Sequence, residues 1–188
     1  MTMAHNKIRT IAMVVVVACL PVFGACQETT DAPVAAPELQ ELGADLVYYG
    51  MESFLTAEGV REGRIRADTA YTYAEVGEVH MRGMELVLYE EDGRARATIT
   101  AREGEMEDGS DRMVARGDVV LVVHSDGRKI ESAELHYDPA RDRIWSDSTT
   151  VQTLPGGRVT QGTAFESDLD FTEVRIENPR GSIGAVGG

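Results

Sequence analysis

Few side chains in this sequence have the types and spacing that catalysis requires. His80, His124 and His136 are scattered along the chain, and there is no Gly-x-Ser-x-Gly, His-Glu-x-x-His or glycine-rich phosphate-binding loop. Asp138 and Asp142 flank a turn that contains a proline, which we interpret as a solvated turn, with a calcium loop or carboxylate pair as the alternative. An enzyme needs converging polar groups, so we predict that the protein is not an enzyme.

The residue with the clearest chemical role is Cys26. A basic head and an apolar run over residues 11–25 precede it, and this run is shorter than the ~20 residues that a helix needs to span a bilayer. The pattern predicts a secretory signal over residues 1–25. Gly24-Ala25-Cys26 resembles the lipobox of bacterial lipoproteins, although Phe23 replaces the usual leucine. The resemblance implies cleavage and lipidation of Cys26, and the alternative is an ordinary signal or uncleaved anchor.

The second cysteine, Cys19, lies inside the predicted signal. After cleavage only Cys26 remains, so an intrachain disulfide is excluded. No cysteine and histidine cluster has metal-ligand spacing, and we expect neither a metal nor a cofactor.

The charge excludes one class of partner. Lys7 and Arg9 belong to the signal, so the rest of the chain has 16 basic residues against 32 acidic ones. Nucleic acid needs a basic face, and so does a polybasic patch on anionic lipid. We expect no nucleic acid partner, and we interpret the negative charge as an aid to solubility.

Residues 26–44 are interpreted as the lipidated cysteine and a flexible tether. Residues 27–39 are threonine, alanine, proline and acids without an apolar period, and such a segment buries too little surface to fold. Extended at ~3 Å per residue, the tether would let a domain stand up to about 55 Å from a membrane.

Residues 45–183 are internally similar and are expected to form one domain, and we expect residues 184–188 to form a loose tail. Four units of about 30 residues each hold two strand-like runs and end in a turn glycine: Gly93, Gly127, Gly157 and Gly181. Asp92-Gly93 and Asp126-Gly127 are typical of hairpins. The pattern predicts nine or ten strands and an all-β domain.

Alternation along these strands predicts one apolar face. Val174 and Ile176 alternate with charged residues, and counting back from each turn glycine gives their equivalents. The predicted inward set, a candidate groove, contains Leu86, Leu88, Ile99, Val120, Val122, Leu135, Phe165, Val174 and Ile176. Several inward positions are alanine, which leaves space for an apolar ligand between sheets; closely packed sheets without a cavity are the alternative. The single tryptophan, Trp145, is interpreted as packing rather than ligand stacking.

Four short motifs, in order, resemble the LptC family of lipopolysaccharide-transport proteins, and more loosely LptA and the organic-solvent-tolerance domain. They begin at Met113 (MVARGDVVL), Ile130 (IESAELHYDP), Ile144 (IWSD) and Gly162 (GTAFESD). The resemblance covers roughly residues 45–183. It implies an open, twisted β-jellyroll with lipid A acyl chains between its sheets, and jellyrolls stacked edge to edge across the periplasm. Family members usually keep a transmembrane helix, whereas this apolar run ends in a lipobox-like cysteine.

The resemblance implies a membrane-anchored component of lipopolysaccharide transport at the periplasmic face of the inner membrane, with the outer membrane as the alternative. Its implied partners are lipopolysaccharide, other jellyroll proteins of the bridge and the inner-membrane ABC transporter. The alternative function is an assembly lipoprotein that binds another envelope protein without lipid cargo. We predict docking at a terminal strand over residues 171–178, with Phe171, Val174 and Ile176 at the partner edge. The N-terminal strand around residues 46–49 is the alternative edge.

Overall fold

The computed structural model describes residues 43–57 and 59–182, so the predicted signal, Cys26, most of the tether and nearly all of the tail lie outside the described residues. Within them the chain is almost entirely β, as predicted, with twelve strands and one short 3-10 turn, η1 (Pro139–Arg141). The strands are β1 (Leu46–Ala57), β2 (Val60–Tyr73), β3 (Glu78–Tyr89), β4 (Ala95–Glu107), β5 (Met113–Val123), β6 (Lys129–Asp138), β7 (Arg143–Ser146), β8 (Thr150–Thr153), β9 (Val159–Gly162), β10 (Ala164–Ser167), β11 (Arg175–Glu177) and β12 (Arg180–Ser182).

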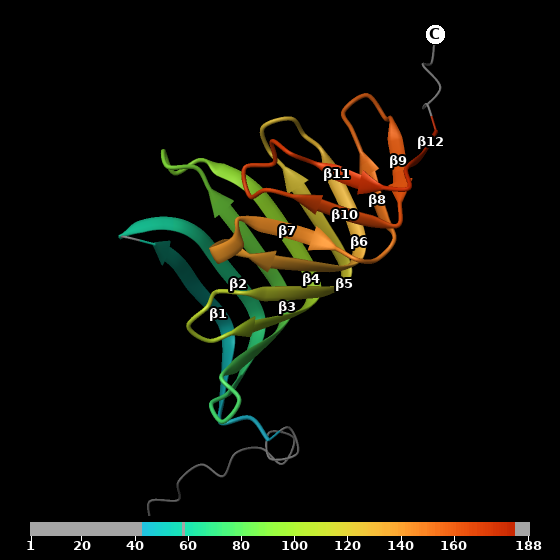
Figure 1. Cartoon of the computed structure of the whole chain (residues 1–188). Coiled ribbons are helices and arrows are strands. Elements are labelled where there is room, and N and C mark those ends of the chain that lie inside the picture. The colour runs from blue at the N-terminus through green and yellow to red at the C-terminus, as the bar shows by residue number, and fades with distance from the viewer. Residues whose placement is uncertain (1–42, 58, 183–188) are drawn as a thin grey trace, which may run out of the picture. The chain divides into compact units, whose positions relative to one another are not determined.

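All strand pairs are antiparallel, and β1 to β6 follow one another as neighbours (Figure 1). The path divides at β6. One half of β6 pairs with β8, which continues to β9 and β12, and its other half pairs with β7, which continues to β10 and β11. The sheet therefore forks into two halves that share six long strands.

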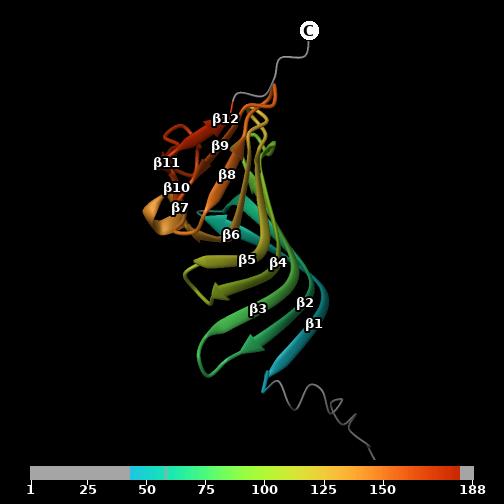
Figure 2. The same cartoon turned by 90° about the vertical axis from the view of Figure 1, so that its right-hand side faces the viewer.

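The long strands bend in a row that we call the crease. The pairing register is interrupted there between neighbouring strands, and the side view shows each long strand changing direction (Figure 2). The crease residues are Gly50, Asp68, Gly83, Arg102, Gly117, Asp118 and Ala133. Half A is the part that leads to β8, β9 and β12, and half B is the part that leads to β7, β10 and β11.

All three crease glycines have a positive φ, which other residues rarely adopt, and two of them lie against polar side chains. Gly83 has φ +62° and Gly117 has φ +77°. The Asp68 side chain lies where a Cβ of Gly83 would be, and a Cβ on Gly117 would come 2.8 Å from Arg102 Nε. Arg102 also pairs with Asp118 at 3.1 Å. Small residues at the bend thus make room for the polar side chains of the neighbouring strand.

The crease reverses the inward alternation of side chains. Ala67 and Ala70 on β2 are both buried, and so are Met81 and Met84 on β3, although each pair is three residues apart. Strict alternation would place members of such a pair on opposite faces. The inner faces of both halves consequently bury one apolar cluster, which ends at Phe165 and Phe171.

The predicted turn glycines are confirmed at Gly93, Gly127 and Gly157, whose amides close the β3–β4, β5–β6 and β8–β9 turns. Gly181 instead lies inside β12. No helix in residues 43–57 and 59–182 is long and apolar enough to cross a membrane.

Candidate binding groove

Most of the predicted groove residues lie on the inner faces of the two halves. Leu86, Leu88 and Ile99 are buried in half A, and Leu135 and Phe165 are buried in half B. Register explains their proximity within each half, since Leu86 pairs with Ile99. The sequence therefore identified the apolar face of these strands, while their role in lipid binding stays a prediction.

The predicted inward orientation of Val120 and Val122 is wrong. On β5 the buried residues are Val119, Leu121 and Val123, and the two predicted valines alternate with them. The turn explains the error: the Gly93 amide donates to Glu90, three residues back, but the Gly127 amide donates to Val123, four residues back. One extra turn residue shifts the count by one and exchanges the faces.

The predicted terminal strand over residues 171–178 is shorter than expected. Its regular part is β11 (Arg175–Glu177), and Val174 and Ile176 pack partly buried against the core. Phe171 is not on an edge: it lies in a turn with φ +58° and is 6% exposed. Asn178, at φ +46°, and Pro179 then turn the chain so that β12 pairs with β9 in half A.

The space left by small inward residues is filled by methionine. Met81, Met84 and Met113 are buried, and Met51 and Met106 pack partly buried against the same cluster. A Cβ on Gly104 would overlap the sulfur of Met84. Methionine is unbranched and has three rotatable bonds, so an interior filled by it can repack around another apolar group.

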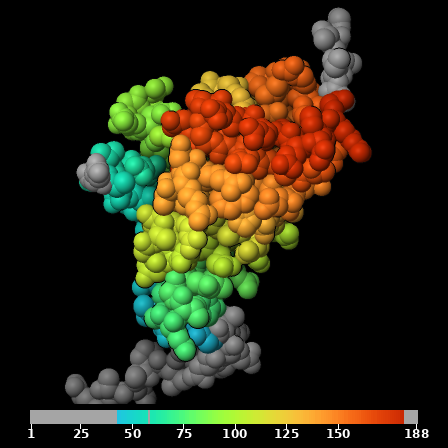
Figure 3. Space-filling model, viewed as in Figure 1, coloured from blue at the N-terminus to red at the C-terminus, as the bar shows by residue number. Residues whose placement is uncertain are grey.

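A loop over residues 168–174 closes the interior beside β11. Arg96, from half A, donates to Asp170 Oδ1 at 2.5 Å and to the Leu169 carbonyl at 3.2 Å. From the other side, the Leu169 amide donates to Asp142 Oδ1 at 3.1 Å. The loop thus ties half A to the η1 turn. In the space-filling view the C-terminal part of the chain, coloured orange to red, lies across the upper part of the visible face (Figure 3).

Asp168 holds this loop in shape. Its Oδ1 accepts hydrogen bonds from the amides of Thr172, at 2.8 Å, and Glu173, at 3.0 Å, and from the Ser167 hydroxyl at 3.1 Å. Partial burial opposes ionisation, but these donors and the Thr172 hydroxyl outweigh it and hold the pKa of Asp168 below its usual value. The ionised carboxylate therefore stabilises the turn that presents Phe171 to the core.

The opposite end of the sheet carries a long free edge. In the described part of the chain, β1 pairs with β2 alone. Leu46, Tyr48, Tyr49 and Phe54 on this strand are exposed, and Tyr49 reaches 75%. Such a cluster of exposed apolar residues on one unpaired strand is typical of an interaction site.

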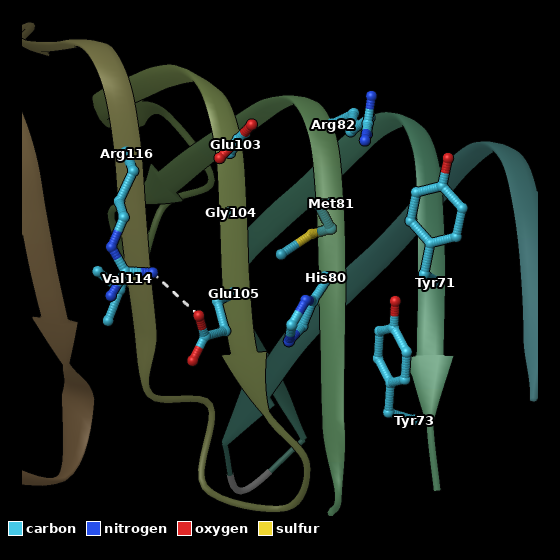
Figure 4. Close-up of a pocket in the computed structure, with 10 residues that line it drawn as sticks. All are labelled: Tyr71, Tyr73, His80, Met81, Arg82, Glu103, Gly104, Glu105, Val114 and Arg116. Atoms are coloured by element: carbon cyan, nitrogen blue, oxygen red, sulfur yellow. Dashed lines mark hydrogen bonds and ion pairs between the residues drawn. The ribbon is translucent and has the colours of Figure 1, made fainter. Parts of the chain in front are cut away.

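The outer face of half B carries a ladder of charged and aromatic side chains. His80 lies between Tyr71 and Glu105 in register, and Arg116 joins Glu105 at 2.9 Å to Glu134 at 3.1 Å. This face has a hollow of about 190 Å³. Figure 4 labels the residues that line it: Tyr71, Tyr73, His80, Met81, Arg82, Glu103, Gly104, Glu105, Val114 and Arg116.

Further along the ladder, Trp145 stacks on His136, with ring centroids 4.8 Å apart. The Arg143 guanidinium lies over the Trp145 ring, 4.5 Å from its centroid. The His136–Glu134 hydrogen bond, at 2.7 Å, is the main cause that lowers the pKa of Glu134. Trp145 therefore packs against strand neighbours of its own chain, which fits the packing interpretation.

The aspartates of the proline turn have structural roles. Asp138 caps η1 and accepts from the Arg141 amide at 3.2 Å, while Asp142 ends the turn at φ +50° and accepts from Leu169. Asp138 is buried, so the solvated turn predicted for this pair is wrong at that position. Local patterns could not predict this burial, because an aspartate beside a proline turn is usually exposed.

Comparison with known proteins gives the family. The family model described as "Lipopolysaccharide-assembly, LptC-related" matches residues 13–183. The chain belongs to this LptC-related family. Its members are components of the periplasmic lipopolysaccharide-transport bridge, and they are not known as enzymes. No curated protein matches the sequence significantly.

The fold also resembles that of a solved bridge protein, LptH from Pseudomonas aeruginosa, described as the LptA-homologous periplasmic component of the lipopolysaccharide transport device. The TM-score is 0.51 at 13% identity, over 64% of this chain and 94% of LptH. At this identity the likeness concerns the fold alone. It confirms for the LptC-related chain the open β-jellyroll that the sequence motifs implied.

The LptC-related chain also contains a group that the sequence analysis missed. Glu78, His80 and Glu105 place one ligand atom each within 4.8 Å of the others. The group does not follow a cysteine and histidine spacing, because two of its residues are glutamates and one of these, Glu105, lies on another strand. The Glu78-Val79-His80 alternation was the available signal, since residues two apart share a strand face.

Proposed function

We propose that this protein carries lipid A acyl chains between halves A and B of its sheet, as a membrane-anchored component of lipopolysaccharide transport. The observation that carries the proposal is the interior of the sheet: Met81, Met84 and Met113 are buried beside alanine and glycine positions. An acyl chain is apolar and flexible, and it can take the volume that movable methionine side chains vacate.

The binding mode follows from the fold. The strands supply a fixed backbone, because each of the six long strands is hydrogen-bonded to its neighbour in the sheet. The side chains supply an adaptable lining. The acyl chains would lie against Leu86, Leu88, Ile99, Leu135 and Phe165, and Val174 and Ile176 would line the end near β11. Val120 and Val122 are excluded from this proposal, since they alternate with the buried residues of β5.

A photo-crosslinking experiment tests the proposal. Met51 packs partly buried against the core, whereas its neighbour Glu52 is exposed and pairs with Arg66 at 2.6 Å. A benzophenone at Met51 should capture lipopolysaccharide in cells, and the same probe at Glu52 is the matched control. Equal capture at both positions, or none at Met51 in a folded variant, contradicts the proposal.

We further propose that partner jellyrolls continue the sheet at its free ends. The C-terminal end, β11, keeps the role predicted for the terminal strand, but Phe171 no longer belongs to that edge. The β1 end has the longer strand and the exposed Leu46, Tyr48, Tyr49 and Phe54. Other jellyroll proteins of the bridge and the inner-membrane ABC transporter are the proposed partners. The protein would sit at the periplasmic face of the inner membrane through lipidated Cys26.

Docking has its own test, which separates it from lipid carriage. Probes at Tyr49 on β1 and at Arg175 on β11 should crosslink to jellyroll proteins, and a probe at Val122, in the middle of the sheet, should not. Crosslinks from both edges together with an empty interior would favour the alternative function, an assembly lipoprotein without lipid cargo.

A further inference from the structure

We propose that Glu78, His80 and Glu105 form a binding site for one divalent transition-metal ion, for which Zn²⁺ has the best-matched chemistry. The site lies on the outer face of half B, away from the apolar interior, and does not depend on the proposed lipid function. The three ligand atoms lie within 4.8 Å of one another in the structure.

The strand geometry sets the three ligands in a triangle. Glu78 and His80 are two residues apart on β3, so they share a face, and Glu105 on β4 is the register partner of His80. Directly opposed Cβ atoms in an antiparallel pair are about 4.5–5.5 Å apart. Zinc at ~2.1 Å from each ligand brings donor atoms to about 3.4 Å from one another. We expect rotation of the two glutamate side chains to close this gap.

The charge of this face favours a cation. Across the ladder, Glu78, Glu103, Glu105, Glu107 and Glu134 are set against three arginines, Arg82, Arg112 and Arg116. Arg116 forms ion pairs with both Glu105 and Glu134. It can therefore remain paired with Glu134 when Glu105 coordinates a metal ion. Within the described residues, Glu78 and Glu105 then have no arginine partner, and a divalent ion balances their charge.

The imidazole is already oriented. His80 Nε2 lies 2.9 Å from Glu78 Oε2, and the Tyr73 ring packs against the His80 ring with centroids 4.7 Å apart (Figure 4). A neighbouring ring that limits the rotation of a ligand lowers the entropy lost on binding. An imidazole with two carboxylates suits zinc, whereas calcium and magnesium prefer sites made wholly of oxygen.

The chain contains a matched control. Glu134 and His136 repeat the Glu-x-His pair on β6, with the atoms 2.7 Å apart, but the register neighbours of His136 are Val114 and Trp145 instead of a carboxylate. This second pair has two of the three ligands. It should not hold zinc by itself, because loss of one ligand of three removes most of the affinity.

Titration of ZnCl₂ into the tag-free full-length chain in detergent, followed by calorimetry, tests the proposal. We expect one zinc per chain, at least tenfold weaker binding in His80→Gln and in Glu105→Gln, and unchanged binding in His136→Gln. Circular dichroism checks that each variant is folded. The proposal is overturned if the wild type takes up no zinc, if His80→Gln binds as tightly as the wild type, or if Ca²⁺ displaces zinc at equal concentration.

Discussion

Phe171 gives a sharp test of how the loop over residues 168–174 is built. Its ring is buried in the core while its backbone has φ +58°, a region that costs a residue with a Cβ about 1–2 kcal/mol. Removing a buried phenylalanine ring to alanine costs about 3–5 kcal/mol in a protein core. The ring thus holds a strained backbone in place, and the two contributions can be separated by comparing two substitutions.

Phe171→Ala removes the ring and keeps the backbone strain, so we expect the free energy of unfolding to fall by about 3 kcal/mol. Phe171→Gly removes both, and the relief of the left-handed backbone should return about 1 kcal/mol, which leaves a loss of about 2 kcal/mol. The glycine variant should therefore be the more stable of the two. Urea denaturation followed by the fluorescence of Trp145 measures both values.

A matched pair at Thr100 provides the control. Thr100 is exposed in the middle of β4, where glycine is about 0.5–1 kcal/mol less stable than alanine. At Thr100 the alanine variant should therefore be the more stable of the two, whereas at Phe171 the glycine variant should be the more stable. If Phe171→Gly is less stable than Phe171→Ala, or if both variants lose under 1 kcal/mol, the ring does not anchor the loop as described.

The other predictions concern the strand faces, the loop carboxylate and the anchor. Leu121→Ala should lower the free energy of unfolding by about 3 kcal/mol, and Val122→Ala by under 1 kcal/mol, because Leu121 is 0% exposed and Val122 lies on the other face; equal losses in urea denaturation would contradict the face assignment. The pKa of Asp168 is lower in the folded protein than in the unfolded chain, where it is ~3.9. The carboxylate therefore stabilises the fold at pH values above ~3.9, and this stabilisation is lost as the pH falls through the pKa of the folded state. Relative to wild type, Asp168→Asn should thus exchange the amide hydrogens of the loop faster at pH 7, and this difference should shrink below about pH 4; a difference that grows on acidification would oppose the sign. Cys26→Ala should release the protein from membranes or leave it unprocessed, and an unmodified Cys26 in the intact mass of the wild-type protein would rule out the anchor.

The crease and the lengths of the turns decided which apolar residues face inward. Alternation identified Leu86, Leu88 and Ile99 because they lie on one side of the crease and close to a regular turn. It failed at Val120 and Val122, where a turn one residue longer shifted the count. A two-residue period carries no information about where its phase changes, so a bend or a longer turn reverses every later assignment.

The contacts on the outer face of half B and those of the loop over residues 168–174 could not be predicted from local patterns. Glu105 is the register partner of His80 although 25 positions separate them in sequence, and Arg96 reaches Asp170 across 74. Such pairs form only when the long strands are aligned and folded at the crease. Their residues are ordinary charged positions in the sequence, and burial or partners become visible only in the folded sheet.

The sequence by itself determined the all-β class, the apolar face of most strands, three of the turn glycines and, through its motifs, the LptC-related family. These depend on side-chain period, turn chemistry and motif order, which are local properties of the chain. Tertiary structure alone decided the forking at β6, the crease, the methionine packing between the halves and the burial of Phe171. These depend on contacts between distant strands, and the free energy of such contacts exists only once the strands are brought together.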